Sequence, residues 1–184
     1  MSCHRTFPVI ASVFSILLAA GSARADLIVN GGFETGDFTG WEIWMAPLGS
    51  MFGLSNDANL AHTGNYSFYF AGLGGEPDAI YQIVPTVAGQ QYRLTFWLNY
   101  DSTFGERFRV SWEGTTVLEL TPVEMTNGWK EYTLQLTATA SGSELRFAGN
   151  DFRSYIRLDD VSLVEVAAVP SPASAALGVI GAGF

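Results

Sequence analysis

One segment of the chain combines the side chains with which proteins hold sugars. Between Tyr92 and Tyr100 alternate residues form two sets, and the polar set places Trp97 among Arg93 and Asn99. An aromatic ring stacks on the C–H face of a sugar, while amide and guanidinium groups bind its hydroxyls. Arginine also holds uronate or sulfate groups through paired hydrogen bonds. The pattern predicts a ligand-binding surface made by Arg93, Trp97, Asn99 and Arg109, the last from the strand expected to follow.

The same aromatic and basic residues also fit two different roles. The arginines of this face can pair with the many surface carboxylates, with Trp97 covered by a loop. Three aromatic residues in predicted loops, Trp41, Trp44 and Phe52, are further candidate sugar contacts, although Trp41 fits a core position better.

Residues suited to catalysis are few. After residue 25 the chain has one histidine, His62, and no cysteine, and it lacks the G-x-S-x-G, H-E-x-x-H, P-loop and G-x-G-x-x-G motifs. His62 precedes the Thr63-Gly64 turn, where we expect it to pack rather than act as a base. A glycosidase needs only two carboxylates about 5–10 Å apart. We predict a protein that is not an enzyme, with a secreted glycoside hydrolase as the less favoured alternative.

Short runs with period-two alternation dominate residues 28–166, and they are rich in Phe, Tyr, Val, Thr and Leu. Such runs are typical of strands with one buried face, and the Gly and Asn residues between them suit turns. The sequence therefore predicts an all-β fold, a two-sheet antiparallel β-sandwich or jelly roll. The clearest strands are 66–71, 79–84, 92–100, 108–112, 116–120, 130–137, 144–149 and 155–166.

The last predicted strand has a break in its alternation. Leu158 points inward by parity, but Val161 and Leu163 continue the apolar set out of phase. A β-bulge at Asp159-Asp160 would restore the register and bring both carboxylates toward one point.

The two ends of the chain differ in composition from its middle. Residues 1–25 have a basic start, an apolar stretch over 7–20 and an Ala23-Arg24-Ala25 cleavage site, as in a secretory signal peptide. A transmembrane anchor, the alternative, needs about 20 apolar residues without this small-residue exit. We expect a mature chain that begins at Asp26, one domain over 26–166 and a separate tail over 167–184.

The mature chain is expected to be strongly acidic and free of thiols. Removal of residues 1–25 leaves seven basic and 18 acidic residues, a net charge of −11, and takes away Cys3. A surface this acidic repels nucleic acid and anionic lipid, so neither is an expected partner. Since disulfides are impossible, a hydrophobic core must stabilise the domain.

Four segments resemble secreted domains with a galactose-binding-like jelly roll. They are NGGFETGDFTGW (30–41), AHTGNYSFYF (61–70), GQQYRLTFWL (89–98) and YIRLDDVSLVEV (155–166). The resemblance implies that residues 30–42 lead into the sandwich as its first strand and that residues 155–166 form its last strand.

In carbohydrate-binding domains of this kind the first and last strands lie side by side and hold a structural calcium ion. The resemblance implies that Glu34 and the Asp159-Asp160 pair bind such an ion together with the turn at Asn65, which gives the candidate ligands Glu34, Asn65, Asp159 and Asp160. Calcium takes six to eight hard oxygen ligands, which carboxylates and loop carbonyls supply. The alternative is an acidic turn that is solvated and binds no metal.

The tail resembles a PEP-CTERM sorting signal of Gram-negative exopolysaccharide producers, with Val169, Pro170 and Pro172 in its motif. Ser171 stands where that signal has Glu, and the final apolar run would span only ~18 Å as a helix, against ~30 Å for the hydrocarbon core. We expect a degenerate or incomplete signal, which contacts a membrane only if it is completed; a low-complexity secreted tail is the alternative. The resemblance implies recognition by an exosortase and delivery to the cell envelope, outer surface or matrix.

The function predicted from these features is non-catalytic. We expect an exported cell-envelope or biofilm-matrix protein with a calcium-stabilised jelly roll that binds exopolysaccharide or another carbohydrate. The alternative is a structural or adhesive surface protein without affinity for sugar.

Overall fold

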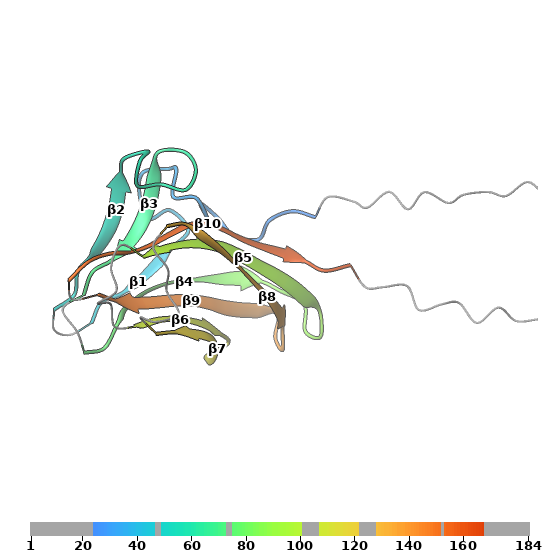
Figure 1. Ribbon diagram of the computed structural model, residues 1–184. Helices are drawn as coiled ribbons and strands as arrows, with labels where there is room; N and C mark the ends of the chain where they lie inside the picture. The colour runs from blue at the N-terminus through green and yellow to red at the C-terminus, as the bar shows by residue number, and fades with distance from the viewer. Residues whose placement is uncertain are drawn as a thin grey trace, which may run out of the picture.

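Two antiparallel sheets of five strands pack face to face (Figure 1). The computed structural model describes residues 24–46, 49–72, 75–100, 107–121, 128–151 and 153–167. Sheet A has the order β1 (Glu42–Trp44), β4 (Asp78–Pro85), β9 (Gly142–Asn150), β6 (Arg107–Trp112) and β7 (Thr115–Leu120). Sheet B has the order β2 (Phe52–Asn56), β3 (Tyr66–Phe70), β10 (Ile156–Glu165), β5 (Gln91–Tyr100) and β8 (Lys130–Thr137). The predicted all-β, two-sheet antiparallel sandwich is confirmed.

The core lies between the sheets, where the inward sets of the alternating strands meet. Leu94 and Phe96 of β5 and Phe108 and Val110 of β6 are fully buried, as their parity predicts. Phe96 and Phe108 approach each other at 6.0 Å between ring centroids, which joins sheet B to sheet A. Burying such a side chain contributes roughly 1.5–3 kcal/mol, so the facing aromatic rows are the main source of stability in a domain without disulfides.

The segment predicted as the first strand is instead a series of turns, so that prediction is wrong. Positive φ angles at Asn30 (53°), Phe33 (59°), Gly36 (74°) and Gly40 (84°) reverse the chain, whereas a strand needs negative φ throughout. The segment still anchors the core: Trp41 is only 5% exposed and its indole Nε1 donates to the Asn30 carbonyl at 3.0 Å. Trp41 is therefore a core residue, as predicted.

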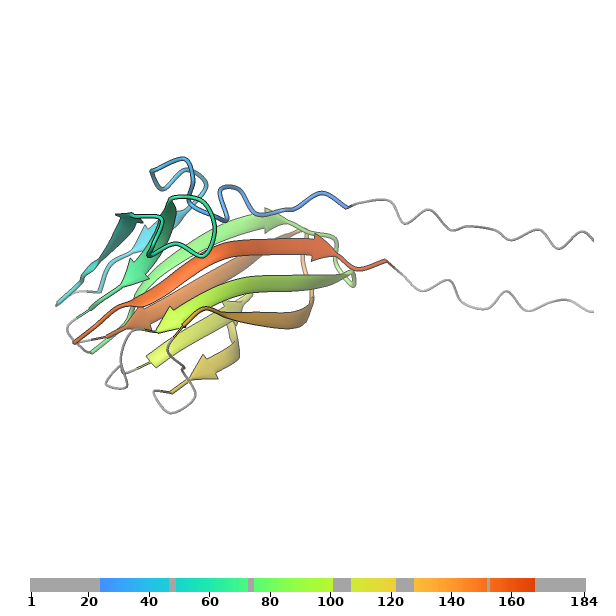
Figure 2. The ribbon, with the colours of Figure 1, turned by 45° about the horizontal axis from the view of Figure 1, so that its top comes forward.

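Residues 24–28 run alongside β10 (Figure 2). Leu27 N donates to the Leu163 carbonyl at 2.9 Å, and the Asp26 carboxylate accepts from Leu163 N at 2.9 Å. The first and last described residues thus lie at the same end of the sandwich. The rest of the predicted signal peptide and the tail motif at Val169, Pro170 and Pro172 lie outside the described residues. Over the described ranges, no helix has the length and apolar character needed to span a membrane.

Candidate functional site

The predicted binding residues are divided between the two sheets. Trp97 and Asn99 lie on β5 in sheet B, whereas Arg109 lies on β6 in sheet A. Both sets face outward, so Arg109 is on the opposite side of the sandwich from Trp97. The expectation of one surface that unites them is wrong, because β5 and β6 are consecutive in the chain but pair with strands of different sheets.

On the outer face of sheet B, the loop over residues 57–65 covers Trp97. The His62 imidazole stacks on the Trp97 ring at 3.7 Å between centroids with an interplanar angle of 14°, and Trp129 meets His62 edge-on at 5.6 Å. Beneath the same loop Ser67 is fully buried and donates to the Leu60 carbonyl at 2.8 Å. One face of the Trp97 ring is therefore occupied by protein, and His62 has the packing role predicted for it.

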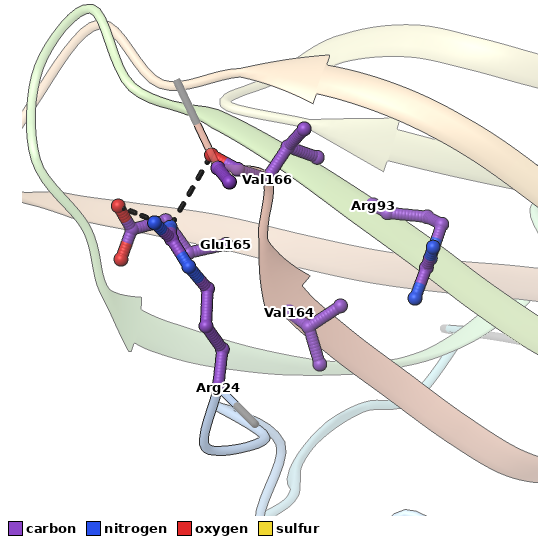
Figure 3. A pocket seen from close by; sticks show the side chains of 6 residues that line it. Arg24, Arg93, Val164, Glu165 and Val166 are labelled. Atoms are coloured by element: carbon purple, nitrogen blue, oxygen red, sulfur yellow. Dashed lines mark hydrogen bonds and ion pairs between the residues drawn. The ribbon is translucent and has the colours of Figure 1, made fainter. Parts of the chain in front are cut away.

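Asn99 and Arg93 have different surroundings on this face. Asn99 Oδ1 accepts from Gly128 N at 3.1 Å, so the side chain holds the chain next to Trp129. Arg93 is exposed and lines a pocket of about 310 Å³ at the end of β10 (Figure 3). Opposite it, Arg24 pairs with Glu165 and with the Val166 carbonyl. Loss of Arg24 with the predicted signal peptide would remove one wall of this pocket.

The predicted bulge in β10 is present. The pairing of β10 with β5 shifts register between Asp159 and Ser162, and Asp160 has a φ of 47°. Both carboxylates accept hydrogen bonds from the start of the His62-Thr63 turn. Asp159 accepts from His62 N at 2.8 Å, and Asp160 accepts from Thr63 Oγ1 at 2.8 Å. His62 Nδ1 lies 2.6 Å from the second Asp160 oxygen. The bulge thus ties the 57–65 loop to the sheet.

Glu34 reaches the same region from the N-terminal turns. Its carboxylate accepts from Asn65 N at 2.9 Å and from Tyr66 N at 2.8 Å. A Cβ on Gly32 would lie 3.3 Å from Asp160 Oδ1, 3.7 Å from Asp159 Oδ1 and 3.8 Å from Glu34 Cγ. The Asp159 and Asp160 carboxylates therefore lie beside Gly32, whereas Glu34 approaches Gly32 with its Cγ and directs its carboxylate at the Gly64-Asn65 turn.

The carboxylates at Gly32 are held by protein donors. Within the residues that the structure describes, no three His, Cys, Asp or Glu side chains are arranged to hold a metal ion. The pKa of Asp159 is raised to about 7, chiefly because the side chain is fully buried and desolvated; the Asp160 charge also raises the pKa, and the N–H donors of His62, Asp160 and Thr63 oppose the shift. The oxygen donors suit calcium in type, but an ion would have to replace some of these hydrogen bonds.

The outer face of sheet A carries a second set of aromatic and basic side chains, defined by register. One row across the five strands runs Glu42, Tyr81, Arg146, Ser111 and Thr116. The next row runs Trp44, Ala79, Ala148, Arg109 and Glu119. We call these ten residues the sheet A face. The two alanines, Ala79 and Ala148, are buried.

The arginines of the sheet A face are oriented by aromatic and acidic partners. The Arg146 guanidinium lies 4.5 Å from the centre of the Tyr81 ring, and its Nε is 2.8 Å from the Glu144 carboxylate. Arg109 Nε is buried without a hydrogen-bond partner in the described part of the chain, since Glu119 is 3.9 Å away. Trp44 is 39% exposed. An exposed indole, a tyrosine ring and two guanidinium groups thus share one surface.

Sequence reasoning missed Tyr81 and Arg146 and placed Trp44 in a loop, whereas it ends β1. Alternation within the predicted strands 79–84 and 144–149 puts Tyr81 and Arg146 on the outward side. The pairing of β4 with β9, which brings these two residues opposite each other, cannot be read from any local pattern.

Comparison with known proteins agrees with this architecture. Residues 25–151 match the family model of the CBM_4_9 carbohydrate binding domain, and the chain belongs to that family. A comparison with curated proteins found no matching sequence.

Several solved structures share the fold. The module TmCBM61, solved with β-1,4-galactotriose, has a TM-score of 0.59 and 20% identity, over 77% of this chain and 99% of that one. The CBM22-1 xylan-binding domain of Paenibacillus barcinonensis Xyn10C has a TM-score of 0.58 and 16% identity, over 82% and 100%. A cyclase from Fischerella sp. TAU has a TM-score of 0.58 and 18% identity, over 79% and 99%. The sandwich is therefore a jelly roll of the carbohydrate-binding type, in a fold that also occurs in an enzyme.

Proposed function

We propose that this protein is exported and binds polysaccharide through the sheet A face. The observation that carries the proposal is the register that sets Tyr81 opposite Arg146 and places Trp44 and Arg109 in the adjacent row. Membership of a carbohydrate-binding family supports sugar as the ligand class. The function is non-catalytic binding.

The chemistry of the sheet A face suits a sugar chain. The rings of Trp44 and Tyr81 offer apolar surfaces for sugar C–H groups. The Arg109 side chain is 29% exposed, so its guanidinium can donate to hydroxyl or carboxylate oxygens of the ligand. On the outer face of sheet B, by contrast, the His62 imidazole already stacks on one face of the Trp97 ring. That face, with Arg93, Trp97 and Asn99, is the second candidate surface.

Substituting one arginine on each face distinguishes between the two candidate binding surfaces. We expect Arg146→Ala to weaken retention on the polysaccharide that the wild type binds by about tenfold, because a central desolvated contact is typically worth more than 1 kcal/mol. Arg93→Ala removes the same charge from the outer face of sheet B and should leave retention unchanged. Affinity electrophoresis in gels that contain galactan, xylan or an acidic exopolysaccharide measures both. Equal retention of wild type and Arg146→Ala would contradict the proposal.

We also propose that calcium binds beside Gly32, held by Glu34, Asp159 and Asp160 with the turn at Asn65. Two observations support this: the Asp159 and Asp160 carboxylates lie beside Gly32 together with the Cγ of Glu34, and an ionised Asp159 is costly in a fully buried site. Calcium would supply the missing positive charge and tie the N-terminal turns to β10.

Calcium should raise the melting temperature, and EDTA should lower it again, because an ion that binds only the folded state stabilises that state. Glu34→Gln removes a carboxylate charge and should reduce the shift produced by calcium. Identical melting curves in calcium and in EDTA, with no calcium found by elemental analysis, would rule the site out.

For the setting of this function we propose the cell envelope or extracellular matrix of a Gram-negative bacterium, reached through the signal peptide and an exosortase that acts on the tail. The resemblances of the two terminal segments support this. A structural or adhesive surface protein is the alternative, favoured if no polysaccharide retains the wild type.

A further inference from the structure

A pocket of about 380 Å³ opens between the edge strands of the two sheets, and none of its lining residues belongs to the sheet A face. β7 is the last strand of sheet A and β8 the last strand of sheet B, and the pocket lies between them. We call it the edge groove. Its lining residues are Trp112, Glu113, Thr115, Val117, Gln135, Leu136, Thr137 and Thr139. The volume falls within the range of about 300–1,000 Å³ typical of small-molecule sites.

The edge groove has an apolar floor that is fixed across the two sheets. Trp112 and Leu136 are almost fully buried, and Val117 is partly buried beside them. Trp112 Nε1 of β6 donates to the Thr137 carbonyl of β8 at 3.0 Å. This bond holds the indole in place at the junction of the sheets, so the floor is preformed.

The rim of the groove is polar but offers no free charge. Its one ionised side chain among the lining residues, Glu113, accepts from Thr139 N at 2.9 Å and from Thr139 Oγ1 at 2.6 Å. Ser143 Oγ donates to Oε1 of the same carboxylate, the oxygen that also accepts from Thr139 N. These donors occupy Glu113, and the exposed side chains of Thr115, Gln135 and Thr137 remain as hydroxyl and amide groups.

A neutral saccharide is the ligand that matches both parts. Its C–H groups fit against the apolar floor, and its hydroxyls exchange hydrogen bonds with threonine and glutamine. The Glu113 charge disfavours an acidic sugar. An added peptide strand is disfavoured because Glu119 on β7 and Lys130 and Glu131 on β8 are exposed charges on the edge strands, which oppose strand addition.

We propose that the edge groove is a second carbohydrate-binding site, which takes a short segment of a neutral glycan independently of the sheet A face. A domain with two such sites would cross-link two glycan chains when each site binds a different one. When both sites bind the same chain, the domain would bind that chain more tightly.

The indole N–H of Trp112 reports on this groove by NMR. We expect its resonance, assigned with a Trp112→Phe variant, to shift saturably on titration with at least one of three neutral probes, β-1,4-galactotriose, xylotetraose or cellotetraose, at millimolar concentration. The shift should persist in Arg146→Ala, where the sheet A face is disabled. Thr115→Trp, which fills the groove from its exposed rim, should abolish it; Thr133→Trp, on an exposed position of β8 outside the lining, should not.

Two outcomes would overturn the proposal. The first is a Trp112 resonance that none of the three probes moves, whether or not the wild type binds sugar through the sheet A face. The second is a resonance that moves with protein concentration alone while sedimentation shows a dimer, since a second copy would then occupy the groove. A wild type that shows no binding at the sheet A face but still shows the Trp112 shift would refute only the proposed function.

Discussion

Gly31→Ala is expected to prevent folding or to lower the free energy of unfolding by more than about 3 kcal/mol, beyond the usual cost of overpacking. A Cβ at this position would lie 1.9 Å from the Val161 carbonyl oxygen and 3.2 Å from Ile28 Cγ2. The obstacle is backbone, which a rotamer change does not relieve. Val161 N also donates to the Gly31 carbonyl at 3.0 Å, so any displacement breaks the link between the N-terminal turns and β10.

Gly142→Ala is the matched control for this prediction. Gly142 begins β9, and a Cβ there would meet only Ile83 Cγ2 at 3.6 Å, an ordinary contact. We expect a change within about 1 kcal/mol, in either direction. Urea unfolding of both variants measures the contrast. Equal unfolding free energies for Gly31→Ala and the wild type would show that the N-terminal turns do not pack against β10 as described.

The second large effect is a loss of stability between about pH 4 and about pH 7 in the absence of calcium. Burial raises the pKa of Asp159 to about 7 from its ordinary value of 3.8. Between these values the folded state keeps a proton that the unfolded chain has released, so stability falls as pH rises. The difference between these two pKa values corresponds to roughly 4 kcal/mol.

Other carboxylates act in a lower pH window. Hydrogen bonds lower the pKa of Asp37, Asp57 and Glu113, so their stabilising contribution is present at neutral pH and is lost only in acid, below their ordinary values. Urea unfolding in EDTA at about pH 4.5 and about pH 8 should therefore isolate Asp159. In Asp159→Asn the slope against pH should flatten, whatever the absolute stability of the variant. A wild type that gains stability over this interval would contradict the assignment.

Local pattern was sufficient for most of the fold. Eight strands were predicted near their observed positions because each shows alternation and is bounded by turn residues. β1 spans only Glu42–Trp44, and β2 has Gly53 within its five residues, so neither has a period long enough to detect. The N-terminal segment was misassigned because Phe33 adopts a positive φ, which a non-glycine residue rarely does.

The candidate site depended on information that no short segment contains. The adjacency of their strands in sequence groups Arg109 with Trp97, yet the chain crosses between sheets after β5. His62 was correctly expected to pack, but its partner was not identifiable, since the stack on Trp97 requires a loop to fold over sheet B. The bulge at Asp159-Asp160 was predictable because a break in parity is visible in the sequence itself.

Binding of polysaccharide through the sheet A face is tested most directly by calorimetric titration of Tyr81→Ala and Trp97→Ala with the oligosaccharide that the wild type binds. Both variants lose one outward aromatic ring, and their circular dichroism spectra should match the wild type. We predict that Tyr81→Ala binds at least about tenfold more weakly and that Trp97→Ala keeps wild-type affinity. Loss of affinity in Trp97→Ala together with unchanged affinity in Tyr81→Ala would contradict the account and assign the site to sheet B.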